Sequence, residues 1–229
     1  RSLLITVGIW MTASTATVAQ RVVMVHEEPR HRLIYDTPDL RVLDVQIQPG
    51  DTTLYHTHKS PITYVTISTS STDQMILGGA WNNTQPINPP PGRIGAVRAV
   101  QSYAEQSITH RVTNVGHTLF RLIAVPSKRS GKENAAASGT VPGDLISETR
   151  WFRNSVLRIA GYQASTGHIA HAPTVLVMVR DGRVIIERGD GWMTSLEAAG
   201  QSTIISEDEH YIIRNRGQQT SDIAFVEVR

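Results

Sequence analysis

Short runs of apolar and β-branched residues dominate the chain after residue 20, and turn residues separate them. The runs lie at 22–25, 41–48, 62–67, 74–77, 97–100, 119–125, 156–159, 175–179, 184–187, 202–205, 211–214 and 223–228. These are lengths typical of strands, and dipeptides such as Pro49-Gly50 and Asp181-Gly182 favour turns between them. A helical period of 3.6 is hard to find in the same region. The pattern therefore predicts an all-β protein built as a sandwich or barrel.

The chain also contains an internal repeat. Residues 56–61 (HTHKSP) correspond to 168–173 (HIAHAP), and residues 113–116 (TNVG) correspond to 214–217 (RNRG). In each half a strand pattern follows the proline, then a turn, then a second strand. A repeat of this length indicates two copies of one domain rather than a solenoid.

Residues 1–19 are typical of an export leader, with a basic first residue, a short apolar run and a small-residue cleavage site. The apolar run is shorter than the roughly 20 residues that a membrane-spanning helix needs. An N-terminal strand or an uncleaved anchor is the alternative. We expect a periplasmic or secreted protein with no stable membrane span after cleavage. Its expected organisation is a signal peptide (1–19), an N-terminal domain (20–126), a linker (127–144) and a C-terminal domain (145–229).

Composition narrows the functional classes. The 229 residues are 40% hydrophobic, and Lys+Arg 22 against Asp+Glu 20 leaves a net charge of +2. The arginines are scattered singly instead of clustered, which argues against a nucleic-acid partner. The sequence contains no cysteine, which excludes disulfides, thiolate metal sites and cysteine nucleophiles.

The histidines supply candidate chemistry. His56 and His58 are two residues apart, so on a strand both imidazoles leave the same face. Imidazoles are good ligands for first-row divalent metals, and His110, in another strand-like segment, is the candidate third ligand. The spacing predicts a site for one divalent transition metal held by His56, His58 and His110.

This arrangement resembles the cupin superfamily. Gly50 is followed after five residues by His56-Thr57-His58, as in the first cupin motif, and His110 is followed by Asn114, as in the second. We expect Asn114 to be a turn residue rather than a ligand. Because the likeness extends over both halves, the protein looks like a bicupin. The resemblance implies two cupin-type β-barrels (double-stranded β-helix, or jelly roll) in tandem, with the metal site in the N-terminal barrel.

The first motif departs from the family pattern in two ways: its acidic ligand is missing, and Ser68-Thr69-Ser70-Ser71 stands in place of its last turn glycine. Its glutamate ligand should fall at Ile62 or Thr63, and neither is acidic. The chain therefore resembles the three-histidine cupins, in which the metal is commonly non-haem iron in dioxygenases. Iron is the metal that this resemblance favours, with manganese, copper, zinc and nickel as alternatives. Three neutral imidazoles do not offset the +2 charge of the metal ion. They also leave coordination positions open for O2 or an anionic substrate.

Two further residues are candidates for catalysis. Glu105 lies five residues before His110 and could act as a base beside the metal, or it could be a solvated turn residue. Thr63 occupies the position of the missing acid and could line the site or simply fill the core.

The second half keeps His168, but Ala170 and Tyr211 stand where the other two ligands would be. We expect no metal there. The sequence thus favours an exported metal-binding bicupin, a mononuclear non-haem metal oxygenase of the dioxygenase type that acts on a small organic molecule. A non-catalytic module that binds a sugar or an organic acid is the alternative. A duplicated barrel kept for assembly, with incidental histidines, is a third interpretation, and a homodimer is compatible with all of them.

Overall fold

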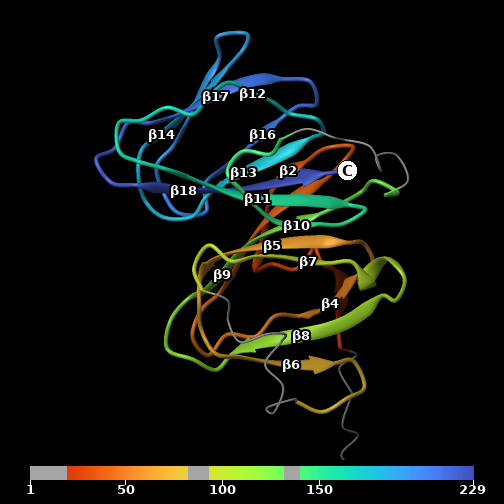
Figure 1. Cartoon of the computed structure of the whole chain (residues 1–229). Helices are drawn as coiled ribbons and strands as arrows, with labels where there is room; N and C mark the ends of the chain where they lie inside the picture. Colours follow the sequence, from red (N-terminus) through yellow and green to blue (C-terminus); the bar gives the residue numbers. More distant parts are fainter. Residues whose placement is uncertain (1–19, 82–92, 132–139) are drawn as a thin grey trace, which may run out of the picture.

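A computed structural model describes residues 20–81, 93–131 and 140–229, and nearly all of its regular structure is β-strand. Figure 1 shows two stacked barrels, the N-terminal one in red to yellow-green and the C-terminal one in green to blue. One turn of 3-10 helix, η1 (Ser102–Ala104), precedes strand β8. The all-β prediction is confirmed. Within the described ranges no helix is long and apolar enough to cross a membrane, and the predicted leader 1–19 lies outside them.

Two sheets form the N-terminal barrel. The five-stranded sheet has the order β2-β3-β9-β5-β7, and the four-stranded sheet has the order β1-β4-β8-β6. β1 runs parallel to β4, whereas β4 and β8 are antiparallel. The strands are β1 (Val22–Met24), β2 (His31–Asp36), β3 (Arg41–Ile47), β4 (Tyr55–His58), β5 (Ile62–Ser68), β6 (Thr72–Ile76), β7 (Val97–Val100), β8 (Ile108–Asn114) and β9 (Phe120–Pro126).

The C-terminal barrel is built in the same way. Its sheets have the orders β10-β11-β18-β13-β16 and β12-β17-β14-β15. The strands are β10 (Asp144–Glu148), β11 (Phe152–Ile159), β12 (His168–Ile169), β13 (Thr174–Met178), β14 (Val184–Arg188), β15 (Met193–Leu196), β16 (Ser202–Ile205), β17 (His210–Asn215) and β18 (Ser221–Val228).

Strand register makes the two barrels comparable residue by residue. The order β2-β3-β9-β5-β7 is repeated as β10-β11-β18-β13-β16, and β4-β8-β6 is repeated as β12-β17-β14. Where His56 pairs with His110 in the first barrel, His168 pairs with Tyr211 in the second. Apart from β1, each strand of the N-terminal barrel therefore has a counterpart in the other barrel, and β15 is the strand that the C-terminal barrel adds.

One hydrophobic cluster joins the barrels. It contains Leu40, Val42, Val65, Ile67, Ile123 and Val125 from the first barrel and Phe152, Val175, Val177, Ala224, Val226 and Val228, among others, from the second. These residues come mainly from the two five-stranded sheets, so the outer faces of those sheets pack against each other. The Tyr35 hydroxyl donates across this contact to the Ser202 carbonyl at 3.0 Å. The sheet that carries β4 and β8 lies on the side away from the second barrel (Figure 1).

The predicted strand runs coincide with observed strands. The runs do not include β2, β4, β8, β10, β12 and β15, and of these β4 and β8 lie inside their sheet and carry the three histidines. β2, β10 and β15 each lie at the edge of a sheet. Because an edge strand is partly exposed, its sequence can be polar, as in Asp144–Glu148, whose residues are mostly exposed. At the linker, Ser127 is still part of the first barrel, since it is buried and its amide donates to the Pro61 carbonyl at 2.9 Å.

A buried asparagine ends the same strand in both barrels. The Asn114 amide donates to the Ile47 and Thr118 carbonyls, both at 2.8 Å. Asn215 repeats this pattern with the Ile159 carbonyl at 3.0 Å and the Gln219 carbonyl at 2.7 Å. Each Asn is almost fully buried and also accepts a bond from the amide two residues ahead. Asn114 is thus the last residue of β8, and it ties the turn to β3.

We expect Asn114→Ala and Asn215→Ala each to lower the free energy of unfolding by about 1–3 kcal/mol, because two buried carbonyls lose their donor. Urea unfolding measures the change. Gln219→Ala is the matched control, since Gln219 is exposed and serves Asn215 only through its main-chain carbonyl. That variant should stay within about 0.5 kcal/mol of the unsubstituted protein. Equal stability of all four proteins would contradict the role of the asparagines.

Candidate metal centre

Three histidines meet on the inner face of the sheet formed by β4 and β8. His56 and His58 alternate with Thr57 along β4, so both imidazoles leave the same face. The register pairs His56 directly with His110 on β8, and cross-strand partners share a face. The predicted grouping of His56, His58 and His110 is therefore what the strand register produces.

The imidazoles of the triad lie close together and are nearly inaccessible to solvent. Their ring centroids are 4.7 Å apart for His56 and His110, 5.0 Å for His58 and His110, and 5.1 Å for His56 and His58. One ligand atom from each histidine can be chosen so that all three lie within 4.8 Å of one another. The exposed fractions are 2%, 4% and 6% for His56, His58 and His110.

Hydrogen bonds determine which ring nitrogen of His56 and of His110 carries the proton. The His56 Nδ1 lies 3.0 Å from the Leu54 carbonyl, and the His110 Nδ1 lies 3.1 Å from the Gln74 side-chain oxygen. Both partners only accept, so each Nδ1 carries the proton and each Nε2 keeps its lone pair. The second ring nitrogen of both residues is thus available for a metal.

Burial also keeps the triad uncharged. It lowers the pKa of His56 and of His110 to about 3, with repulsion from neighbouring imidazoles as the smaller cause. The pKa of His58 is lowered well below its ordinary value for the same reasons. A metal-binding imidazole must be neutral, and these three are neutral at pH 7 and in mild acid.

The donor set fits a first-row metal ion. His58 Nε2 and His110 Nε2 are 3.1 Å apart. Two nitrogens that bind one ion at about 2.0–2.1 Å are separated by about 3 Å. The nitrogens of His58 and His110 therefore lie at the spacing that a shared divalent ion requires, and a ligand nitrogen of His56 lies within 4.8 Å of both.

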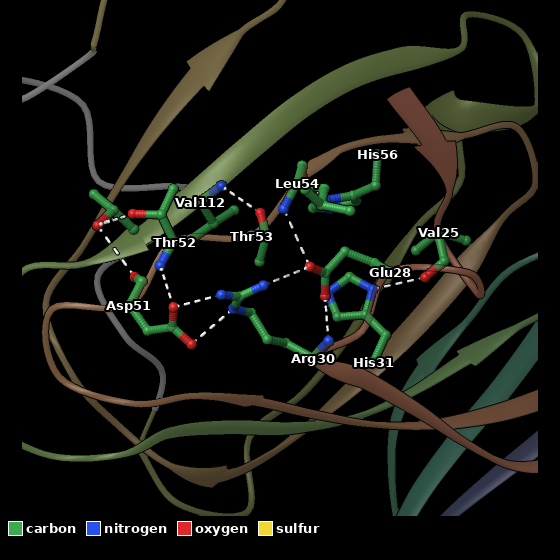
Figure 2. Close-up of polar contacts among 11 residues, drawn as sticks. Val25, Glu28, Arg30, His31, Asp51, Thr52, Thr53, Leu54, His56 and Val112 are labelled. Atoms are coloured by element: carbon green, nitrogen blue, oxygen red, sulfur yellow. Dashed lines mark hydrogen bonds and ion pairs between the residues drawn. The ribbon is translucent and has the colours of Figure 1, made fainter. Parts of the chain in front are cut away.

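A buried polar network lies behind His56 (Figure 2). The Glu28 carboxylate is buried and accepts the Leu54 amide at 3.1 Å, while the Leu54 carbonyl accepts from His56. Arg30 links Glu28 to Asp51, with one guanidinium bond to Asp51 of 2.5 Å. The network holds the chain before β4 in the conformation that directs His56 inward.

His31 is a fourth histidine in this region that the sequence pattern did not single out. Its ring is 4.7 Å from the ring of His56, edge to face, and its Nδ1 is 2.7 Å from the Val25 carbonyl. Burial lowers the pKa of His31 to about 4. The sequence signal that could have pointed here is the run HEEPRHR at 26–32, which concentrates titratable residues between two strands.

The two predicted catalytic residues lie elsewhere. Glu105 ends η1, its side chain is exposed, and its amide donates to the Ser102 carbonyl. Thr63 is fully buried on β5, where its hydroxyl oxygen is 3.4 Å from the Asn154 amide of the other barrel. The structure thus brings Thr63 to the contact between the barrels rather than to the histidines. A catalytic role for either residue stays a prediction.

The C-terminal barrel keeps a histidine at only one of the three corresponding positions. His168 and Tyr211 pair as His56 and His110 do, but Ala170 takes the place of His58 and Ile186 takes the place of Gln74. Ala170, Ile186 and Tyr211 belong to a closed hydrophobic core. Within the described residues the triad of the first barrel is the single group of this kind.

No protein-family model matches the chain, and no curated protein matches it either. Solved structures do match the chain. The chain is 12% identical to a cupin 2 conserved barrel domain protein from Leptotrichia buccalis, with a TM-score of 0.54 over 86% of this chain and 87% of that one. It is 12% identical to AerE from Microcystis aeruginosa, with a TM-score of 0.59 over 88% and 98%.

A third similar structure is a salicylate 1,2-dioxygenase from Pseudaminobacter salicylatoxidans, 10% identical, with a TM-score of 0.55 over 84% of this chain and 72% of that one. At these identities the likeness concerns the fold. The protein has the cupin fold, two barrels in tandem, and a histidine triad that could hold a metal ion.

The lowered pKa values predict how stability depends on pH. An unfolded histidine takes up a proton near pH 6.5, whereas the pKa of folded His56 and of folded His110 is about 3, so protons favour the unfolded state in between. The free energy of unfolding of the metal-free protein should therefore fall as the pH drops from about 6.5 to about 4.

Urea unfolding at several pH values measures this fall. The variant His110→Gln should show a shallower pH dependence, because one buried imidazole is gone. Both proteins have the same carboxylates. The difference between their pH dependences of the free energy of unfolding is therefore the contribution of His110. Identical slopes for the two proteins would contradict the neutral, buried state of His110.

Gln74 should orient His110 through the bond to Nδ1. Gln74→Ile copies the second barrel, and we expect it to weaken metal binding about 10–100-fold, as loss of a ligand's hydrogen-bond partner usually does. Gln74→Glu keeps an acceptor and should bind metal much more tightly than Gln74→Ile. Gln218→Ile, at an exposed position, is the control. Competition with a chromophoric chelator measures the affinities, and unchanged binding by Gln74→Ile would contradict this role.

Proposed function

We propose that this protein is a bicupin that holds one divalent metal ion, iron in the first place, through His56, His58 and His110, and that it is an oxygenase of the dioxygenase type for a small organic molecule. The observation that carries the proposal is the convergence of three buried, neutral imidazoles in one barrel. The likeness of the fold to cupin barrels, including a dioxygenase, supports the reaction class. Export is part of the proposal and rests on the leader-like residues 1–19.

The residues around the triad have distinct tasks in this proposal. His56, His58 and His110 hold the metal, and the Leu54 carbonyl and Gln74 keep two of the rings in the required tautomer. Tyr103 packs against His58, with ring centroids 4.7 Å apart, and limits access of water from that side. When bound, a redox-active divalent ion supplies Lewis acidity and positions for O2 and for an anionic substrate.

The first experiment measures metal in untagged protein purified without chelators, by mass spectrometry, beside His110→Ala and His117→Ala. The proposal predicts about one equivalent of a single metal per chain, lost in His110→Ala because one of three ligands is missing. His117 is exposed after β8, so His117→Ala should keep the metal.

Two outcomes would count against the proposal. Absence of metal from all three proteins, even after reconstitution with Fe(II), would leave a duplicated barrel with incidental histidines. Equal metal content in His110→Ala and the unsubstituted protein would place the metal elsewhere. An oxygen electrode then tests the reaction class, because an oxygenase consumes O2 in the presence of its organic substrate.

A non-catalytic module that binds a small molecule such as a sugar is the second candidate function. One feature favours it: the C-terminal barrel has an open groove of about 880 Å³ beside Trp192, whose side chain is 69% exposed. The groove is lined by Arg188, Gly189, Asp190, Trp192, Ser206, Glu209 and His210. Ligand binding without O2 consumption by the metal-loaded protein would support this candidate over the oxygenase.

A further inference from the structure

An open groove of about 880 Å³ lies at one edge of the C-terminal barrel. One wall is the turn between β14 and β15, with Asp190 and Trp192, and the other is the segment 206–210 that leads into β17, with Ser206 and His210. β14 and β17 lie on the side of this barrel away from the first barrel (Figure 1). None of the lining residues belongs to the hydrophobic core that closes this barrel or to the histidine triad. The groove is therefore separate from the metal centre.

Hydrogen bonds hold Trp192 in a defined position on the turn. The Arg188 amide donates to the Trp192 carbonyl at 2.8 Å, and the Gly191 amide donates to the Arg188 carbonyl at 2.9 Å. Gly191 has a φ of +86°, a conformation that glycine adopts without strain. The Asp190 carboxylate accepts the Trp192 amide at 2.9 Å. The Trp192 side chain is nevertheless 69% exposed, so a well-defined backbone presents this large apolar ring to solvent.

Polar contacts join the two walls of the groove. The Gly189 amide donates to the His210 carbonyl at 2.7 Å. Arg188, from the first wall, donates to both carboxylate oxygens of Glu209, at 2.7 Å and 2.9 Å. Glu209 also accepts the Ser206 amide at 2.8 Å. The walls are thus fixed relative to each other before a ligand arrives, and a preformed groove lowers the entropy cost of binding.

The first barrel shows that the fold does not need the ion pair between these walls. The register places Ile76 where the second barrel has Arg188. It places Ile108 where the second barrel has Glu209. Two isoleucines therefore suffice at this edge of a barrel of the same architecture. The charged pair, and the groove that it closes on one side, are features of the second barrel.

The chemistry of the groove disfavours an ionic ligand. The charge of Arg188 is compensated by Glu209, so an anion would meet the carboxylate of Asp190 without a free cation to offset it. A quaternary ammonium ion is usually held by a cage of several aromatic rings, whereas the lining contains one, that of Trp192. A neutral ligand fits this balance of charges better than either ion.

The groups that remain available suit a ligand with many hydroxyls. Asp190 uses Oδ1 for the Trp192 amide, and among the described residues no side chain or amide occupies its Oδ2. The exposed His210 imidazole and Ser206 hydroxyl likewise have no side-chain hydrogen bond within the described ranges. A sugar hydroxyl both donates and accepts, so it can bond to a carboxylate oxygen and to an imidazole or hydroxyl.

We propose that this groove binds a pyranose unit of an oligosaccharide. The apolar C–H face of the sugar ring covers the indole of Trp192, and its hydroxyls bond to Asp190 and His210. Burial of the indole against that face removes apolar surface from water. A volume of about 880 Å³ is within the range of small-molecule sites. The inference deepens the second candidate function, on which it rests, and it does not depend on the metal.

The test is a calorimetric titration of metal-free protein with four probes: maltohexaose, cellohexaose, mannohexaose and chitohexaose. At least one should bind with a dissociation constant below about 1 mM. Trp192→Ala should weaken that binding about tenfold or more and leave the metal content of the loaded protein unchanged. Tyr162→Asn is the matched control, because it removes an equally exposed ring from another loop. Asparagine tolerates the positive φ of Tyr162, and this variant should bind normally.

Asp190→Asn tests the polar half of the site. The substitution keeps an oxygen that can accept the Trp192 amide, so the turn should persist. It removes the negative charge that strengthens a hydrogen bond from a sugar hydroxyl, and binding should weaken about threefold or more. Unchanged affinity of Asp190→Asn would contradict the part of the proposal that assigns a sugar hydroxyl to this carboxylate.

Several results would overturn the proposal. It is wrong if none of the four probes binds to the unsubstituted protein, or if Trp192→Ala binds the best probe as tightly. Sugar binding that is lost in His110→Ala but kept in Trp192→Ala would place the sugar in the first barrel. Displacement of the sugar by an equal concentration of tetramethylammonium would assign the groove to cations. Because the titration uses metal-free protein, its failure and the failure of the metal site are distinguishable.

A second measurement needs no substituted protein. N-bromosuccinimide oxidises accessible tryptophans, and peptide mass spectrometry identifies the oxidised positions. The probe that binds best should protect Trp192. Trp81, which packs against Arg111 in the first barrel with the guanidinium carbon 4.7 Å from its ring centroid, should be oxidised at the same rate with and without the sugar. Equal oxidation of Trp192 in both conditions would overturn the proposal even where Trp192→Ala fails to fold.

Discussion

The antiparallel pairing of β4 with β8 is the constraint on which the site depends. This register sets His56 opposite His110 and leaves His58 on the same face two residues away. A shift by one residue would turn the histidines of one strand to the other face. Asn114 fixes the end of β8 through its bond to the Ile47 carbonyl. Glu28 fixes the chain before β4 through its bond to the Leu54 amide. These buried polar groups therefore maintain the alignment of β4 with β8.

The two barrels use the same fold for different interiors. In the C-terminal barrel Ala170, Ile186 and Leu176 close the core with apolar side chains. In the N-terminal barrel the same positions are His58, Gln74 and Tyr64, which keep polar groups inside. Burial keeps the imidazoles of the triad neutral. On the side of the first barrel away from the triad, the hydrophobic contact between the five-stranded sheets supports the barrel.

Local pattern could predict most of the strands and the three histidines, because alternation along a strand fixes which side chains share a face. It did not mark β4 and β8 as apolar runs, since their sequences are rich in His and Thr. It could not place residues whose position depends on register between distant strands. His31 and Gln74 contact the triad only through such pairing. The side to which Thr63 points is a property of β5 within the sheet, and the motif spacing alone did not reveal that this side faces the second barrel.

The most direct measurement is anomalous diffraction from crystals of the protein loaded with Fe(II) or Zn(II). The account predicts one strong anomalous peak among the Nε2 atoms of His56, His58 and His110, at about 2.0–2.1 Å from each of them. Crystals saturated with metal whose peak lies at the surface, or in the second barrel, would contradict the central claim that these three imidazoles form the metal site.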